Sequence, residues 1–206
     1  MSNKKYSAIV FDLGNVLIPF DYNLFINRLN NIKPNLGKDF MDFYAKNYHI
    51  HRSFEKGNIE RKDFIARMLE VCENRIDEPT FCKYFSEIFS VNEDTVSLLP
   101  ALKKNYKLFL LSNTNSIHKE FGYQHYDFLK YFDRLFLSHE VGAIKPEPEF
   151  YKAVENYSGI PGNELIFIDD IEIYAQGAKD IGWDAITFQS YPQLTEQFDK
   201  RGIIYK

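Results

Sequence analysis

Cysteine is scarce in this sequence, and long apolar runs are absent. Only Cys72 and Cys82 occur among 206 residues, too few for the disulfide framework of a small secreted domain. Cys72 continues an apolar stripe with helical spacing, which favours a buried thiol over a metal ligand. No apolar segment reaches the length of a signal peptide or of a membrane-spanning helix. We therefore expect a soluble, cytoplasmic protein with no membrane partner.

An excess of basic charge is also lacking. The 25 Lys and Arg residues are outnumbered by 29 Asp and Glu residues, which gives a formal net charge of −4. Because nucleic-acid-binding domains present a basic surface, we expect no nucleic acid partner. Aromatic residues are abundant, with 19 Phe and 14 Tyr. A chain of this length can bury most of them in one domain, or in one core with a modest insertion.

Five short apolar segments have the composition of β-strands. They lie near residues 6–11, 107–112, 134–138, 164–168 and 184–188. Helical patterns separate most of them, and this alternation predicts βα units. The sequence therefore predicts an α/β fold with a mainly parallel sheet.

The interval between the first two strands contains helical patterns but no strand. Apolar side chains recur there at helical spacing, most clearly over residues 81–89. Breaks at residues 33–35, 57–58 and 77–79 divide the interval into helices, which we expect to pack as a small bundle. A further helix, predicted from about residue 94 to 105, returns the chain to the sheet.

The most informative segment is residues 9–17, where an apolar strand delivers Asp12 into a turn that contains Gly14. Open parallel sheets bind their ligands at the carboxyl ends of their strands. At that position Asp12 can serve as a nucleophile, a metal ligand or both. Taken alone, the same pattern also fits an aspartate that only caps a turn or helix.

Three later segments carry further polar residues. One apolar run ends in Ser112 and Asn113, and another ends in the adjacent carboxylates Asp169 and Asp170. Between them, Lys145 stands just before a proline-rich helix start. In this order, the four segments resemble the four motifs of the haloacid dehalogenase superfamily of phosphohydrolases.

The resemblance spans nearly the whole chain, and it implies a two-part architecture. Residues 1–19 and 90–206 would form a Rossmann-like α/β core, and residues 20–89 a helical cap that closes over the substrate. The stretch 54–60 is similar to the turn that leads into the third helix of such a cap. An enclosing cap favours a small phosphorylated metabolite as the substrate.

The resemblance also implies a mechanism. Asp12 would attack phosphorus to give an aspartyl-phosphate, and Lys145 would neutralise the charge on Asp12 and the phosphoryl group. Ser112 and the backbone N–H of Asn113 would hold phosphoryl oxygens. Mg²⁺ would be the cofactor. Its ligands would be the carboxylates of Asp12, Asp169 and Asp170 and the backbone carbonyl of Gly14. Asp169 would act mostly through water.

Gly14 departs from the common pattern of these phosphatases, which carry a second aspartate there as general acid and base. Losing such a group costs on the order of 10²–10⁴-fold in rate. A first motif of the DLGN type resembles a branch that includes glucose-1-phosphate phosphatases. Because an anomeric oxygen is a good leaving group, we expect a sugar 1-phosphate substrate. Asp21 is a candidate substitute acid, and equally a helix cap.

Smaller departures follow the other motifs. Tyr174 stands where an asparagine is usual, and Glu172 is a candidate for part of that residue's supporting role. Asn15 replaces the usual glycine or threonine, and we expect it to serve the turn. The five histidines show no metal-ligand spacing, and we expect structural roles for them.

Two alternatives to a phosphatase remain open from the sequence. A 2-haloacid dehalogenase uses the same nucleophilic aspartate and needs no acid at Gly14, but it works without the metal that Asp169 and Asp170 suit. The second alternative is a binding module that keeps the fold and has lost catalytic power, which Gly14 and Tyr174 favour.

Overall fold

The computed structural model describes residues 5–206 and contains a five-stranded sheet in which every pairing is parallel. The strand order is β3-β2-β1-β4-β5. The strands are β1 (Ala8–Phe11), β2 (Lys107–Ser112), β3 (Arg134–Leu137), β4 (Leu165–Asp169) and β5 (Asp184–Thr187). The predicted α/β class with a parallel sheet is confirmed.

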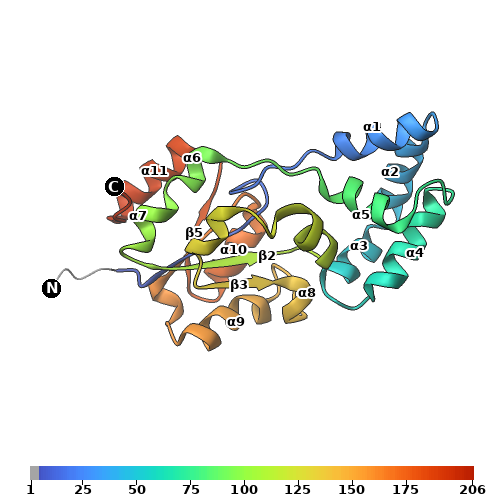
Figure 1. Cartoon of the computed structure of the whole chain (residues 1–206). Helices are drawn as coiled ribbons and strands as arrows, with labels where there is room; N and C mark the ends of the chain where they lie inside the picture. Colours follow the sequence, from blue (N-terminus) through green and yellow to red (C-terminus); the bar gives the residue numbers. More distant parts are fainter. Residues whose placement is uncertain (1–4) are drawn as a thin grey trace.

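The sheet is covered on both faces, which is why its strands are apolar throughout. On one face, α7 (Leu99–Lys103) and α11 (Tyr191–Arg201) pack against residues such as Phe11. On the other face, α9 (Pro148–Ser158) and α10 (Glu172–Asp180) pack against residues such as Val10. Figure 1 shows α9 and the pair α7 and α11 on opposite sides of the sheet.

Residues 22–86, most of the chain between β1 and β2, form a separate group of helices. They are α1 (Tyr22–Ile32), α2 (Leu36–Lys46), α3 (Tyr48–Glu55), α4 (Arg61–Val71) and α5 (Glu78–Ser86). These helices share a hydrophobic cluster of their own, and they lie together to the right of the sheet in Figure 1. The two connections to the sheet run side by side, since Phe20 and Phe89 form an antiparallel bridge.

One predicted helix is wrong in detail. The stretch expected as a single helix over residues 94–105 forms α6 (Glu93–Val96) and α7, with a break between them. Pro100 lies in the first turn of α7, and because proline has no backbone N–H it cannot bond back to Val96. No proline or glycine marks the break at Asn47 between α2 and α3, so the sequence does not predict it.

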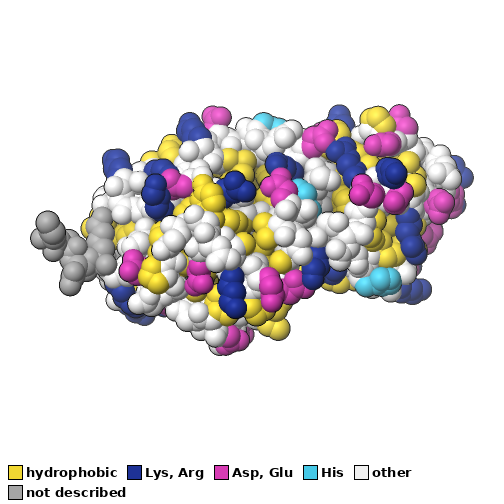
Figure 2. Space-filling model, turned by 90° about the horizontal axis from the view of Figure 1, so that it is seen from below, with side chains coloured by type: hydrophobic (Ala, Val, Ile, Leu, Met, Phe, Trp, Pro, Cys, Tyr) yellow, Lys and Arg dark blue, Asp and Glu magenta, His cyan; other side chains and the backbone are white. Residues whose placement is uncertain are grey.

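The remaining elements are short. They are η1 (His118–Tyr123), η2 (Asp127–Tyr131), α8 (Ser138–Val141) and η3 (Gly162–Glu164). Figure 2 shows acidic and basic side chains interspersed over the visible face. No helix within residues 5–206 combines the length and apolar character needed to cross a bilayer. Cys72 is buried as expected, and burial raises the pKa of its thiol to about 12.

Candidate active site

Three carboxylates meet at the carboxyl edge of the sheet. Asp12 follows β1, Asp169 ends the neighbouring strand β4, and Asp170 comes next. One oxygen from each lies within 4.8 Å of the others. The parallel pairing of β1 with β4 produces this cluster, because it brings the ends of both strands to one place.

Lys145 inserts between these carboxylates. Its Nζ lies 2.8 Å from Asp12 Oδ1 and 2.6 Å from Asp169 Oδ2, and its side chain is 1% exposed. Its backbone is fixed by Asn113, whose Oδ1 accepts from Lys145 N at 2.8 Å and whose Nδ2 donates to Lys145 O at 3.2 Å. The loop after β2 therefore positions the lysine that follows α8.

The protonation of this cluster depends on burial and on its charges. Burial raises the pKa of Asp12, against the lowering effect of Lys145, and the charges of Asp169 and Asp170 add to the rise. Burial would lower the pKa of Lys145, but the two adjacent carboxylates outweigh it and hold the ammonium charged. Burial also raises the pKa of Asp170. Further positive charge beside the cluster would favour the ionised forms of Asp12 and Asp170.

The cluster fits a hard divalent cation such as Mg²⁺, which prefers oxygen ligands. Both oxygens of Asp169 have protein partners, because Oδ1 accepts from Ile171 N at 2.8 Å and Oδ2 contacts Lys145. Asp170 Oδ2 accepts from Asn15 Nδ2 at 3.0 Å. The Gly14 carbonyl, also expected as a ligand, accepts from Val16 N at 2.6 Å and keeps a second lone pair.

Ser112 and Asn113 line a cavity of about 240 Å³ at this edge of the sheet. A second cavity of about 140 Å³ is lined by Asp12 and Asp170. The two cavities share these lining residues: Gly14, Phe20, Tyr48, Glu55 and Asn113. The acidic cluster and the larger cavity therefore belong to one continuous site.

The structure places the residues that depart from the common motifs as follows. A side chain at Gly14 would begin 3.3 Å from the ring of Phe20. Asp21 caps α1 by accepting from Asn23 N, and it lines neither cavity. Asn15 has a positive φ of 53°, as the turn requires, and its bond to Asp170 adds a role that the sequence did not suggest.

Tyr174 contacts the site lysine, whereas Glu172 points to solvent. The Tyr174 ring lies 5.2 Å from Lys145 Nζ, a cation–π contact, and its carbonyl accepts from Tyr151 Oη at 2.8 Å. Glu172 is exposed. Tyr174 therefore packs at the lysine in place of the usual asparagine.

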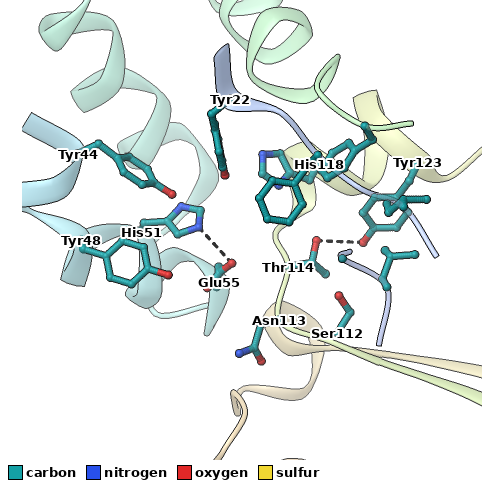
Figure 3. A pocket seen from close by; sticks show the side chains of 15 residues that line it. Tyr22, Tyr44, Tyr48, His51, Glu55, Ser112, Asn113, Thr114, His118 and Tyr123 are labelled. Carbon is teal, nitrogen blue, oxygen red and sulfur yellow. Dashed lines mark hydrogen bonds and ion pairs between the residues drawn. The ribbon is translucent and has the colours of Figure 1, made fainter. Parts of the chain in front are cut away.

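The larger cavity contains residues that sequence reasoning missed. His51 and Glu55 reach it from α3, and His118 reaches it from the segment after β2 (Figure 3). His51 Nε2 lies 3.1 Å from Glu55 Oε1. Their spacing of four residues, one helical turn, was a usable signal for this pair. His118 carried no such signal, because folding alone brings it to the cavity.

The sequence profile of the haloacid dehalogenase-like hydrolase family matches residues 6–182. The chain belongs to this family. The superfamily predicted from the motif residues is thereby confirmed.

Among similar proteins is a D-ribitol-5-phosphate phosphatase of Bacteroides thetaiotaomicron. It is 28% identical over 191 residues, which cover 88% of this chain and 90% of the relative. A pyrimidine 5'-nucleotidase of Escherichia coli is 26% identical over 173 residues, which cover 80% of this chain and 76% of the relative.

Solved structures give the same picture of the fold. A family enzyme from B. thetaiotaomicron, in complex with magnesium and inorganic phosphate, superposes with a TM-score of 0.78 and 29% identity, over 89% of this chain and 94% of that one. An L-2-haloacid dehalogenase from Xanthobacter autotrophicus superposes with a TM-score of 0.63 over 95% of this chain and 83% of that one. At 18% identity it shows the fold alone.

Proposed function

We propose that this protein is a Mg²⁺-dependent phosphatase that hydrolyses a small phosphorylated metabolite through an aspartyl-phosphate. The observation that carries the proposal is the buried contact of Lys145 with Asp12 and Asp169, beside Asp170. An aspartate that only caps a turn at the end of a strand does not require an ion pair with a fully buried lysine. Two similar proteins are a phosphatase and a nucleotidase by name, which supports the same reaction class.

In this proposal Asp12 is the nucleophile. Its carboxylate attacks phosphorus, the bond to the leaving oxygen breaks, and water then cleaves the acyl phosphate to release inorganic phosphate. Lys145 stabilises the charge that develops on the transferring group. Ser112 and the N–H of Asn113 hold its oxygens from the adjoining loop.

The metal ligands in this proposal are Asp12, Asp170 and the Gly14 carbonyl, with Asp169 acting mostly through water. The bonding of both Asp169 oxygens to protein groups supports that indirect role. When bound, Mg²⁺ supplies the positive charge that lets phosphate approach three carboxylates. The family enzyme solved with magnesium and phosphate supports this choice of cofactor.

The domain assignment is part of the proposal. Residues 20–89 act as the cap and residues 1–19 and 90–206 as the core. The larger cavity has walls from both parts, such as Tyr44 and His51 from one and Ser112 from the other. A substrate in this cavity would place its leaving group against the helices and its phosphate against the sheet.

We propose a sugar or polyol phosphate as the substrate class. The cavity of about 240 Å³ suits a small leaving group, and its walls carry hydroxyl, carboxylate and imidazole groups that can bond to hydroxyls. The ribitol-phosphate activity in the name of one relative supports this class. Within it, the absence of an acid at Gly14 favours sugar 1-phosphates, whose leaving oxygen needs less protonation.

The test is phosphate release from a panel of esters that includes sugar 1-phosphates and ribitol 5-phosphate. We expect release with Mg²⁺, no release with EDTA, and loss of at least about 10³-fold in Asp12→Asn. Asp39→Asn, an exposed aspartate on α2, is the matched control and should keep wild-type rates. A folded wild type that binds Mg²⁺ but hydrolyses no ester would contradict the proposal and favour the binding module. Release of halide from 2-haloacids would instead favour the dehalogenase.

A further inference from the structure

One side chain of the helical insertion bonds to the backbone of the site lysine. Arg52, on α3, donates from Nη2 to the carbonyl oxygen of Lys145 at 3.0 Å and from Nη1 to Glu55 Oε2 at 2.9 Å. It lines the smaller cavity together with Asp12 and Asp170, and its side chain is 21% exposed. Arg52 therefore joins the insertion to the loop that carries Lys145, beside the reacting groups.

The carbonyl group of Lys145 is held from two sides. Asn113 Nδ2, from the loop after β2, donates to the same oxygen at 3.2 Å, while Arg52 donates from α3. A carbonyl oxygen has two lone pairs, so these two donors satisfy it. The backbone position of Lys145 therefore depends on one side chain of the core and on one side chain of the insertion.

Two neighbouring contacts hold the end of α3 against the same loop. Lys56 Nζ lies 2.7 Å from Glu147 Oε1. The backbone of Gly57 passes so close to His139 that a Cβ atom at Gly57 would lie 2.7 Å from the His139 carbonyl oxygen. Figure 1 shows α3 next to α8, the helix that contains His139. The end of α3 and this loop therefore form one contact, in which Arg52 is the member that bonds to the lysine.

A guanidinium group suits this bridge. It presents five N–H donors in a planar fork, so it can bond a carboxylate and a carbonyl at once. Burial opposes the charge of Arg52, but the Glu55 carboxylate outweighs it and raises the pKa of Arg52. Burial also opposes ionisation of Glu55, but His51 and Arg52 outweigh it and lower the pKa of this carboxyl group. A charged pair with Glu55 therefore orients Arg52 so that its second donor reaches Lys145.

We propose that Arg52 is a positioning residue of the reaction, which fixes the backbone of Lys145 when the insertion lies against the core. Lys145 Nζ has to meet both Asp12 and the transferring phosphoryl group, and a displacement of about 1 Å in an active site can cost about 10²-fold in rate. Closure of the cap over a substrate then completes the catalytic arrangement. This inference rests on the proposed phosphatase function and on residues 20–89 as its cap.

The test compares Arg52→Ala with Lys56→Ala on the ester of the panel above that the wild type hydrolyses fastest. Arg52→Ala should lower kcat by about tenfold or more with KM within about threefold, because Lys145 acts on the transition state. Lys56→Ala removes a partly exposed ion pair from the same contact and should keep kcat within about twofold. Arg52→Lys keeps the charge beside Glu55 without the fork, and it should still lower kcat by about threefold or more. It replaces Arg52→Ala if that variant does not fold.

The outcomes separate positioning from a purely structural tie. A kcat of Arg52→Ala within about threefold of wild type would overturn the inference and leave the phosphatase function intact. Equal losses of kcat in Arg52→Ala and Lys56→Ala would also overturn it, and would mean that the contact only holds the two parts together. Failure of the wild type on every ester would overturn the proposed function itself.

The carbonyl group of Lys145 gives a readout that is independent of turnover. Labelling with [1-¹³C]lysine and [¹⁵N]proline marks two peptide bonds in this sequence, Lys145–Pro146 and Lys33–Pro34. The ¹³C–¹⁵N correlation signal of the first bond should shift in Arg52→Ala, because the carbonyl oxygen loses a hydrogen bond. The signal of the second bond is the internal control and should stay. An unmoved first signal would overturn the inference whatever the activity.

Discussion

At the scale of single residues, Lys145 has the largest electrostatic effect on the site. It is the cation that lies between Asp12 and Asp169, and it is fully buried with them. Removing one partner from a buried ionic group leaves uncompensated charge, which costs about 3–5 kcal/mol. The same lysine in the proposed mechanism also stabilises the transition state.

Lys145→Ala should therefore lower both activity and stability. We expect kcat/KM to fall by about 10²–10³-fold, and urea unfolding in EDTA to show a loss of about 3–5 kcal/mol. Part of that stability should return with Mg²⁺, which replaces the missing positive charge. Lys152→Ala, on the exposed side of α9, is the control and should change stability by less than about 0.5 kcal/mol. Near-wild-type kcat/KM in Lys145→Ala would refute its proposed role.

Gly14 should make the reaction sensitive to the leaving group. With no acid at this position, 4-nitrophenyl phosphate should be hydrolysed much faster than phenyl phosphate, since the nitro group makes the leaving oxygen more acidic. A new side chain at Gly14 would press on Phe20, so the double variant Gly14→Asp/Phe20→Ala gives the carboxylate room. We expect this double variant to narrow the ratio of the two rates about tenfold or more relative to Phe20→Ala alone. An unchanged ratio would mean that another group already supplies the proton.

Some residues of the candidate site can be placed from the sequence, and others cannot. Asp12, Ser112 and Asp169 could be predicted to share one edge because each ends an apolar strand, and parallel pairing brings those ends together. His118 and Phe20 could not be placed in the cavity in this way. Their positions depend on how the inserted helices pack against the core, and a local sequence pattern does not encode that packing.

At the scale of elements, the first two helices of the insertion approach closely at Gly37. A Cβ atom there would lie 2.3 Å from the carbonyl oxygen of Ile26, and Gly37 N donates to Asn30 Oδ1 at 2.9 Å. The contact between α1 and α2 therefore requires glycine, and it fixes how these helices cross.

Gly37→Ala should destabilise the protein by about 1–3 kcal/mol, because the backbone of α1 has to shift to admit the methyl group. Urea unfolding measures this directly. Lys38→Ala, at the next and exposed position, is the matched control and should have little effect. Equal stability of the two variants would mean that α1 and α2 are less tightly apposed than in this structure.

Some secondary-structure elements are marked in the sequence and others are not. The five strands were predictable because buried parallel strands are continuous apolar runs. The helix expected over residues 94–105 is interrupted at residues 97–98, because Pro100 has no N–H that could bond back to Val96. The single-residue break at Asn47 had no proline or glycine to mark it.

At the scale of the whole molecule, the proposed metal site links binding to stability. Three carboxylates that share one site repel each other, and a bound cation relieves that repulsion. Mg²⁺ at about 100 times its Kd should add about 2.7 kcal/mol, or roughly 5–10 °C in Tm for a chain of this size. Asp170→Asn should remove most of this shift, and Asp39→Asn should keep it. A wild-type Tm that does not respond to Mg²⁺ would refute the site.

The central claim is that Asp12 carries the phosphoryl group between the two halves of the reaction. The most direct measurement is to quench the enzyme in acid during turnover with Mg²⁺ and to map phosphorylated peptides by mass spectrometry. We predict one phosphoryl group on the peptide that contains Asp12, present with Mg²⁺ and absent with EDTA or in Asp12→Asn. Undiminished phosphate release by Asp12→Asn, with no phosphorylated aspartate in the wild type, would contradict the account.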